Sequence, residues 1–170
     1  IIKETEITGT RTTKKLVLAK GTYYIKITGN SGFGDDPIAP FNIKADIISG
    51  NSWEQENNNT FGRANAISIG KKYQGTLFEN ADKDWFKITA SNTGKITATL
   101  KCDPDTDMDD IGRGWEMKVY SAKNMDEALV RKDEIKTAES ISFNVKKGTT
   151  YYIYIETAYY YGTPVGCVYH

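Results

Sequence analysis

The sequence predicts an all-β protein, an antiparallel β-sandwich of the jelly-roll kind, on three observations. Short runs of alternating apolar and polar residues recur along the 170-residue chain, and such runs suit the pleated, half-buried surface of a strand. Glycine, asparagine or aspartate punctuates most of the gaps between these runs, as tight turns require. Helical signals are confined to residues 124–131, where a two-turn helix and a loop fit equally well. Many short strands with almost no helix favour a sandwich.

One strand-turn-strand pattern occurs twice. Residues 15–27 contain an apolar strand, a Lys-Gly turn and a Thr-Tyr-Tyr-Ile strand, and residues 141–156 repeat that order. An internal repeat indicates two copies of one structural unit. We therefore expect residues 1–52 to hold the closing strands of a first sandwich plus a linker, and residues 53–170 to form a complete one.

The incomplete first copy has a structural consequence. Half a sandwich exposes an apolar sheet face and open strand edges, which favour pairing with other strands. Another chain supplies the missing half, or the strands dock on the complete module, or the shortened copy folds as it stands. If the chain that supplies the missing half is a second copy of this one, the protein self-associates through residues 1–48. Because the chain begins at Ile1 rather than Met, we expect it to be a piece of a longer polypeptide.

The complete module has a predictable strand order and core. Alternation places Trp115, Met117 and Val119 on one face, most simply the inward one. Trp85 and Phe86 are neighbours and face opposite sides, so one of them fills the core. The predicted strands lie near residues 65–69, 73–78, 84–90, 94–101, 115–120, 139–146, 150–157 and 165–169.

Composition argues against several function classes. Lys plus Arg equals Asp plus Glu at 22 each, so no basic field is available for nucleic acid. No stretch approaches the roughly 20 apolar residues of a membrane span. The only histidine is His170, the last residue, whereas triad catalysis needs a positioned imidazole and zinc hydrolysis needs nitrogen or sulfur ligands. We expect no enzyme, and a two-carboxylate glycosidase is the weakest alternative.

The two cysteines give no metal or redox motif. Cys102 and Cys167 lack the C-x-x-C spacing of such sites. A structural disulfide between neighbouring strands and two separate thiols are both compatible with the sequence.

Two acidic stretches suggest a calcium site. Residues 54–60 are rich in acids and amides, and residues 82–84 supply two further carboxylates about twenty-five positions later. Hard oxygen ligands of this kind suit Ca²⁺. The alternative is a solvated linker and a hairpin loop. Residues 103–110 are denser in acid but fail the EF-hand pattern, because Met108 and Gly114 occupy its glycine and glutamate positions. We favour a solvated loop there over a second cation site.

An ordered set of motifs resembles the bacterial pre-peptidase C-terminal (PPC) domain family, which is related to the collagen-binding modules of clostridial collagenases. The resemblance covers nearly all of residues 53–170 and implies a jelly-roll-like sandwich attached to secreted proteases and other surface proteins. The matching motifs are Glu54-x-Glu56-Asn57-Asn58-Asn59-Thr60, Ala64-Asn65-Ala66, Gly75-Thr76-Leu77, Asp82-x-Asp84-Trp85-Phe86, Gly94-Lys95-Ile96-Thr97 and Gly148-Thr149-Thr150-Tyr151-Tyr152-Ile153.

The resemblance also implies a ligand set for Ca²⁺. In calcium-binding relatives, the acidic segment before the first strand and the loop before the aromatic strand share the ion. One family carboxylate position falls on Ala81, so we expect the adjacent Asp82 to substitute for it, and Asn59 replaces an acid found in several relatives. The implied metal ligands are Glu54, Glu56, Asn58, Asn59, Thr76, Asp82 and Asp84.

Tyrosines form a second candidate site. Tyr152 and Tyr154 share one face of their strand, and Tyr159, Tyr160 and Tyr161 follow in a loop. Such a patch suits a glycan or protein ligand, with cross-strand packing as the alternative. In the collagen-binding relatives the binding aromatics lie further along this strand, where this chain has Glu156 and Ala158, which argues against collagen.

These observations lead to two function hypotheses. We expect a non-catalytic, calcium-binding accessory module of a secreted or cell-surface bacterial protein that serves adhesion, substrate targeting or spacing between domains. The alternative is a carbohydrate-binding module that uses the tyrosine-rich surface. Either function has an extracellular protein or glycan as partner, and neither involves nucleic acid or a membrane span.

Overall fold

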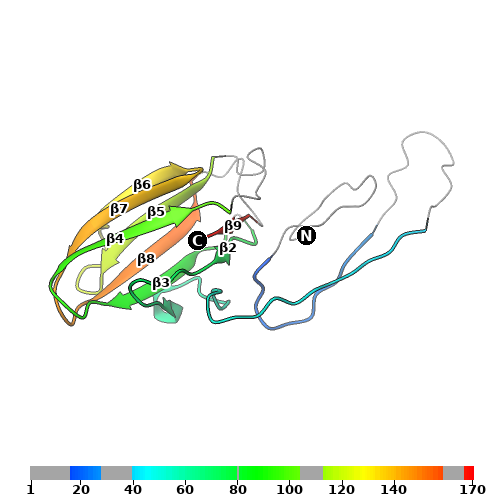
Figure 1. Cartoon of the computed structure of the whole chain (residues 1–170), viewed down its shortest axis with the longest axis horizontal. Helices are drawn as coiled ribbons and strands as arrows, with labels where there is room; N and C mark the ends of the chain where they lie inside the picture. The colour runs from blue at the N-terminus through cyan, green and yellow to red at the C-terminus, as the bar shows by residue number, and fades with distance from the viewer. Residues whose placement is uncertain (1–15, 28–39, 80, 104–112, 159–166) are drawn as a thin grey trace.

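The computed structural model describes residues 16–27, 40–79, 81–103, 113–158 and 167–170. Within these ranges the regular structure is strand apart from one 3-10 turn, η1 (Phe61–Arg63) (Figure 1). No helix of the described residues is long and apolar enough to cross a membrane. The strands are β1 (Asn65–Ala66), β2 (Gly75–Thr76), β3 (Asp84–Thr89), β4 (Gly94–Lys101), β5 (Trp115–Ser121), β6 (Val130–Ile135), β7 (Ala138–Val145), β8 (Thr150–Thr157) and β9 (Val168–Tyr169).

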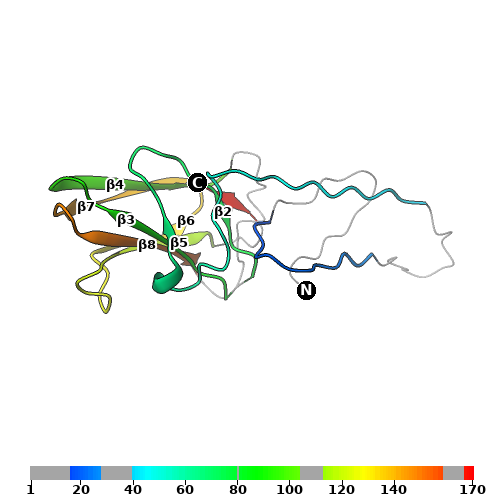
Figure 2. The ribbon, with the colours of Figure 1, turned by 90° about the horizontal axis from the view of Figure 1, so that it is seen from below.

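The strands form a sandwich, as the sequence predicts. One layer is a five-stranded sheet in the order β1-β3-β8-β5-β6, in which only the β1–β3 pair is parallel. The antiparallel pair β4-β7 forms the facing layer, which Figure 2 shows edge-on above the larger sheet. The short antiparallel pair β2-β9 lies at the end of the sandwich nearest the N-terminal segment.

The core lies between the two layers. Trp115, Met117 and Val119 are at most 1% exposed, so the predicted inward face of β5 is confirmed. On β3 the core residue is Phe86, while Trp85 is half-buried on the outward face. The facing pair contributes apolar residues at alternate positions of β4 and β7, among them Leu100, Ile141, Phe143 and Val145. Alternation is what lets each strand give one side to the core.

The sequence-based strand order missed β6. Residues 124–131 do not form a helix: Asn124 bridges Ser121, residues 125–129 are loop, and a strand begins at Val130. Val130 pairs with Val119 and Lys132 with Met117, so cross-strand pairing outweighs the local helix-capping signal. The strands near residues 65–69, 73–78 and 165–169 are also shorter than expected, at two residues each.

The N-terminal segment extends away from the sandwich. Residues 16–27 and 40–50 contain no assigned strand, although the repeat predicts two (Figure 2). Residues 16–19 are half-buried, but most of the later apolar side chains are exposed, with Tyr24 at 91% and Ile47 at 96%. In both copies of the sequence pattern, the first tyrosine after the Lys-Gly turn contacts the backbone of a residue before that turn. The Tyr23 hydroxyl donates to Ala19 O at 2.6 Å, and the corresponding Tyr151 hydroxyl accepts from Lys146 N at 2.9 Å.

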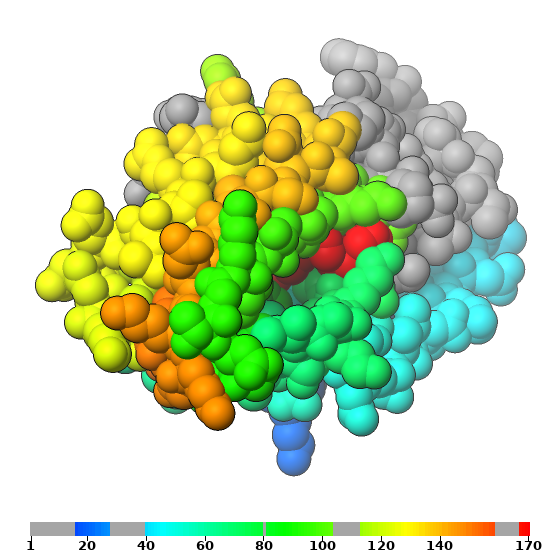
Figure 3. Space-filling model, turned by 60° about the vertical axis from the view of Figure 1, so that its left-hand side comes forward, coloured from blue at the N-terminus to red at the C-terminus, as the bar shows by residue number. Residues whose placement is uncertain are grey.

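The C-terminal residues close the end of the sandwich. His170 and Lys101 exchange backbone hydrogen bonds of 2.7 and 2.8 Å, so the end of the chain is held rather than frayed. In the space-filling view the C-terminal residues, in red, are set into a recess between the green and blue-green parts of the chain (Figure 3). Cys102, next to Tyr169, and Cys167, just before β9, are both buried. The acidic residues 104–110 lie outside the described residues.

Candidate metal centre

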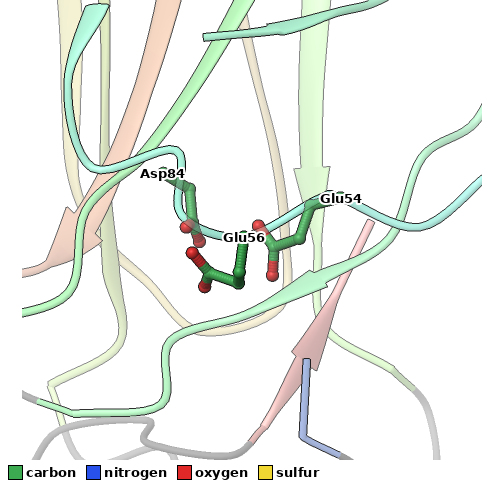
Figure 4. Close-up of side chains that lie close together, drawn as sticks. All are labelled: Glu54, Glu56 and Asp84. Atoms are coloured by element: carbon green, nitrogen blue, oxygen red, sulfur yellow. The ribbon is translucent and has the colours of Figure 1, made fainter. Parts of the chain in front are cut away.

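Three carboxylates converge at the end of the sandwich where β2 and β9 pair. Glu54 and Glu56 come from the segment before η1, and Asp84 is the first residue of β3 (Figure 4). One carboxylate oxygen from each lies within 4.8 Å of the others. The acidic segment and the residues preceding Trp85, some twenty-five positions apart, thus lie side by side.

Backbone hydrogen bonds hold the acidic segment in place. Glu54 N donates to Gln74 O at 2.8 Å, and Gln55 N donates to the side-chain oxygen of Asn65 at 2.6 Å. Further along, Trp85 N donates to Asn58 O at 3.3 Å, which joins the segment to the start of β3. The polar segment is therefore part of the folded module at both of its ends.

Tyr169 completes the inner wall of the centre. Its hydroxyl lies 2.5 Å from Asp84 Oδ2 and 3.1 Å from Glu54 Oε2. A hydroxyl carries one hydrogen, so Tyr169 donates fully to one of the two carboxylates and leaves the other to its remaining partners. Gly75 makes room for this arrangement, since a Cβ there would overlap the Tyr169 ring and hydroxyl and lie 2.8 Å from the Glu54 carboxyl carbon.

Several oxygens around the carboxylates lack hydrogen-bond donors. Within the described residues, Glu56 Oε1 and Asn59 Oδ1 are buried and have no hydrogen-bond partner. The fully buried Asn58 donates its amide nitrogen to Glu54 Oε2 at 3.4 Å, which turns its oxygen toward other acceptors. With the amide reversed, its nitrogen would donate to Glu56 Oε2 at 3.2 Å and Asp84 Oδ1 at 3.1 Å. Buried oxygens without donors are costly unless a proton or cation partners them.

Burial and mutual repulsion make these acids hard to ionise. Burial raises the pKa of Glu54 to about 7, and burial together with the charges of Asp82 and Glu54 raises the pKa of Glu56 to about 8. Burial, with repulsion from Glu54 and Asp82, raises the pKa of Asp84 well above its usual range. Near neutral pH the cluster without a cation therefore retains protons that a bound cation would displace.

The donor set fits a hard divalent cation. The three carboxylates and the nearby amides offer oxygen alone, and neither histidine nor cysteine belongs to the three-residue group. Calcium takes six to eight oxygen ligands with flexible geometry, whereas zinc in proteins favours nitrogen and sulfur. Glu54, Glu56 and Asp84, with the side-chain oxygen of Asn58, would hold such an ion.

Two of the three remaining predicted metal ligands have other hydrogen-bond partners. Asp82 is 1% exposed, and its two oxygens accept Phe78 N at 2.8 Å and Lys83 N at 2.9 Å, so it shapes the turn before β3. Thr76 donates its backbone N–H to Glu54 Oε1 at 2.6 Å, while its hydroxyl accepts Val17 N at 2.8 Å. Asn59 lies nearby with its oxygen unpartnered. Their part in holding a cation stays a prediction.

Sequence reasoning missed Tyr169. The residue comes from the last strand, 85 positions after Asp84, and no local motif marks it. Of the predicted tyrosine site, Tyr152 and Tyr154 do share the outward face of β8, whereas Tyr159, Tyr160 and Tyr161 lie outside the described residues.

The members of the cluster differ in exposure. Glu54 is 4% exposed and Asp84 is fully buried, whereas Glu56 is half-buried. The carboxylates adjoin a tyrosine and an asparagine rather than a nucleophile and an imidazole.

The fold and the centre define a β-sandwich with an acid-lined, closed polar site at one end. No protein-family model matches the chain, and no curated protein does. Among solved structures, the chain is similar to a 1.0 Å crystal structure of the pre-peptidase C-terminal domain of a collagenase from Bacillus anthracis. The likeness has a TM-score of 0.46 and 19% sequence identity, and covers 62% of this chain and 90% of that chain.

Proposed function

We propose that the chain is a non-catalytic accessory module whose fold a calcium ion reinforces, as part of a secreted or cell-surface bacterial protein. The observation that carries the proposal is the convergence of Glu54, Glu56 and Asp84 around buried oxygens that have no donor. Like charges so close, and largely shielded from water, are unfavourable without a positive partner. The motif order that resembles the PPC family agrees with this assignment.

The cation would join two parts of the chain. Glu54 and Glu56 belong to the segment that enters the sandwich, and Asp84 opens a central strand. An ion between them would fix the direction in which the preceding residues leave the module. This is the property that a spacer or targeting module needs. Binding to the folded chain alone adds about 2.7 kcal/mol at a hundredfold excess over Kd, with Kd on the order of 10⁻⁴ to 10⁻⁶ M for an extracellular site.

Thermal unfolding tests the proposal. The full chain is melted in EDTA and again in millimolar CaCl₂ at about pH 7.5, with MgCl₂ as the comparison ion. We expect calcium to raise Tm by on the order of 10 °C and magnesium to raise it less, since magnesium gives up its water shell reluctantly. An unchanged Tm in calcium would end the proposal.

A further inference from the structure

The outward face of the five-stranded sheet carries a cluster of aromatic rings. Strand register places Trp85 of β3 opposite Tyr154 of β8, and Tyr152 of β8 opposite Tyr120 of β5. Phe61 of η1 adds a ring at the margin, 6.2 Å from Trp85 and 6.1 Å from Tyr152 between ring centroids. We call Phe61, Trp85, Tyr120, Tyr152 and Tyr154 the aromatic face.

The rings pack on one another but are not sequestered. The Trp85 ring lies 4.6 Å from Tyr154 and 5.6 Å from Tyr120. Tyr154 is buried by its neighbours, whereas Trp85, Tyr120 and Tyr152 are half-buried and Phe61 is 52% exposed. The core lies on the other side of this sheet, and these five rings are not part of it. Exposed aromatic clusters of this kind mark binding sites.

A fixed polar network borders the rings. Lys118 Nζ lies 2.8 Å from Glu116 Oε2 and 2.9 Å from Glu156 Oε1, and the Tyr154 hydroxyl donates to Glu156 Oε2 at 2.6 Å. Burial alone would raise the pKa of Glu156, but hydrogen bonds from Tyr154 and Lys118 outweigh it and lower that pKa. The border therefore presents oriented acceptors beside the apolar rings without any rearrangement.

An open hollow of about 590 Å³ adjoins the rings at Tyr152. Its lining is mixed: the polar residues Lys87, Thr89 and Thr150 are joined by the isoleucines Ile67, Ile69 and Ile88. Thr89 and Thr150 lie on paired strands with their hydroxyls 3.0 Å apart. The hollow and the aromatic face thus share Tyr152 and form one continuous surface, aromatic at one end and mixed at the other, where hydroxyl-bearing and aliphatic residues lie together.

The charge of this surface restricts its ligand. Lys87 and Lys118 balance Glu116 and Glu156, so neither a polyanion nor a polycation is favoured. A purely apolar partner would cover the Lys118 network and the threonine hydroxyls without offering them hydrogen bonds, which is unfavourable. A sugar chain offers both requirements at once, because its rings have apolar C–H faces and its hydroxyls donate and accept hydrogen bonds.

We propose that the aromatic face and the adjoining hollow bind a neutral oligosaccharide. Sugar rings stack on Trp85, Tyr152 and Phe61, and sugar hydroxyls enter the hollow toward Lys87, Thr89 and Thr150. This site lies on the opposite side of β3 from the carboxylate cluster and does not require a bound cation.

Binding of the full chain to glycans tests this proposal. The 170-residue chain is applied to an array of neutral oligosaccharides, with heparin and a proline-rich peptide as comparison ligands, and the affinity for each hit is then measured by calorimetry. Truncating a central aromatic contact weakens binding by about tenfold or more. We expect that loss for Tyr152→Ala, and no change for Tyr24→Ala, a tyrosine that is 91% exposed on the N-terminal segment.

A second variant keeps the test decisive if Tyr152→Ala unfolds. Phe61 lies on a 3-10 turn that buries none of its residues, so Phe61→Ala should leave the fold intact and weaken binding severalfold. Binding to heparin or the peptide alone, no neutral glycan bound, or glycan binding unaffected by both Phe61→Ala and Trp85→Ala would each overturn the proposal.

Discussion

Asp84 and Trp85 are consecutive residues of β3 whose side chains lie on opposite sides of one sheet. Asp84 is fully buried against the Tyr169 hydroxyl, whereas Trp85 lies on the outward face with its ring 4.6 Å from Tyr154. The backbone N–H of Trp85 also donates to Asn58 O, within the acidic segment. One strand therefore positions a residue of the proposed metal centre and a residue of the proposed glycan site.

Replacing Asp84 by asparagine removes a charge from the centre while keeping nearly the same side-chain shape. The asparagine side chain would keep an oxygen able to accept from Tyr169 while removing one of the repelling charges. We expect Asp84→Asn to melt at or above the wild-type Tm in EDTA and to lose most of the shift produced by CaCl₂. Asp126→Asn, which removes the same charge from an exposed loop, should keep the full shift. A full calcium shift in Asp84→Asn would show that the ion binds elsewhere.

Stability without calcium should fall as pH rises, and the stabilisation by calcium should grow. The unfolded acids titrate near 4.5, but burial raises the pKa of Glu54 to about 7 and of Glu56 to about 8. Between these values the folded chain binds more protons than the unfolded chain, so its stability falls as pH rises.

We therefore expect Tm in EDTA to decrease from about pH 5 to about pH 8, and the increase in Tm caused by calcium to grow over the same window, because the ion replaces the protons. A calcium shift that is as large at about pH 5 as at about pH 8 would contradict this assignment of the raised pKa values.

Removing the Tyr169 hydroxyl should destabilise the chain. Tyr169→Phe keeps the ring, whose centroid lies 6.2 Å from that of Trp115, but deletes the donor to Asp84. Losing a buried donor costs about 1–3 kcal/mol. Chemical denaturation in EDTA measures this, with the exposed Tyr24→Phe as the control. Equal stability of Tyr169→Phe and wild type would mean that the hydroxyl is not a partner of the carboxylates.

Gly75 should tolerate no side chain. A Cβ there meets Tyr169 and Glu54, while a Cβ at Gly94 meets nothing within 4 Å. We expect Gly75→Ala to cost about 1–3 kcal/mol through overpacking and to weaken calcium binding, and Gly94→Ala to have little effect. Similar denaturation midpoints for the two variants would show that the close packing around Gly75 does not contribute to the stability of the fold.

The residues before the sandwich should be dispensable for its fold. In the described residues, the hydrogen bond from Val17 N to Thr76 Oγ1 joins the N-terminal segment to the module. Deleting residues 1–51 removes it but keeps Glu54 and the Trp53–Gln74 bridge. We expect a folded product with Tm within about 5 °C of the full chain. Loss of cooperative unfolding would place the module boundary earlier in the chain.

The sequence was sufficient for features that repeat a local pattern. Alternation identified β5 and its inward Trp115, and the Lys-Gly turn identified the connection between β7 and β8, which lie in different sheets, because strand period and turn chemistry are local properties. It failed at β6, where a capping signal at Asn124 competes with antiparallel pairing to the preceding strand, β5. It also could not choose between Trp85 and Phe86, since which face is inward depends on the opposite layer.

The candidate site likewise has residues that the sequence predicted and contacts that it could not show. Acid spacing and the motif order pointed to Glu54, Glu56 and Asp84, which the structure brings together. Local spacing could not show that Asp82 accepts backbone amides of its own turn, nor that Tyr169 reaches the cluster from the last strand. Those relationships depend on tertiary contacts that no short stretch of sequence encodes.

Calorimetric titration of the full chain with CaCl₂, repeated at about pH 7.5 in two buffers of different ionisation enthalpy, tests the metal centre most directly. We expect a saturable site in wild type that releases protons as it fills, since the raised pKa values leave Glu54 and Glu56 partly protonated, and we expect that site to be lost in Asp84→Asn. No saturable heat in wild type, or an unchanged titration in Asp84→Asn, would contradict the account.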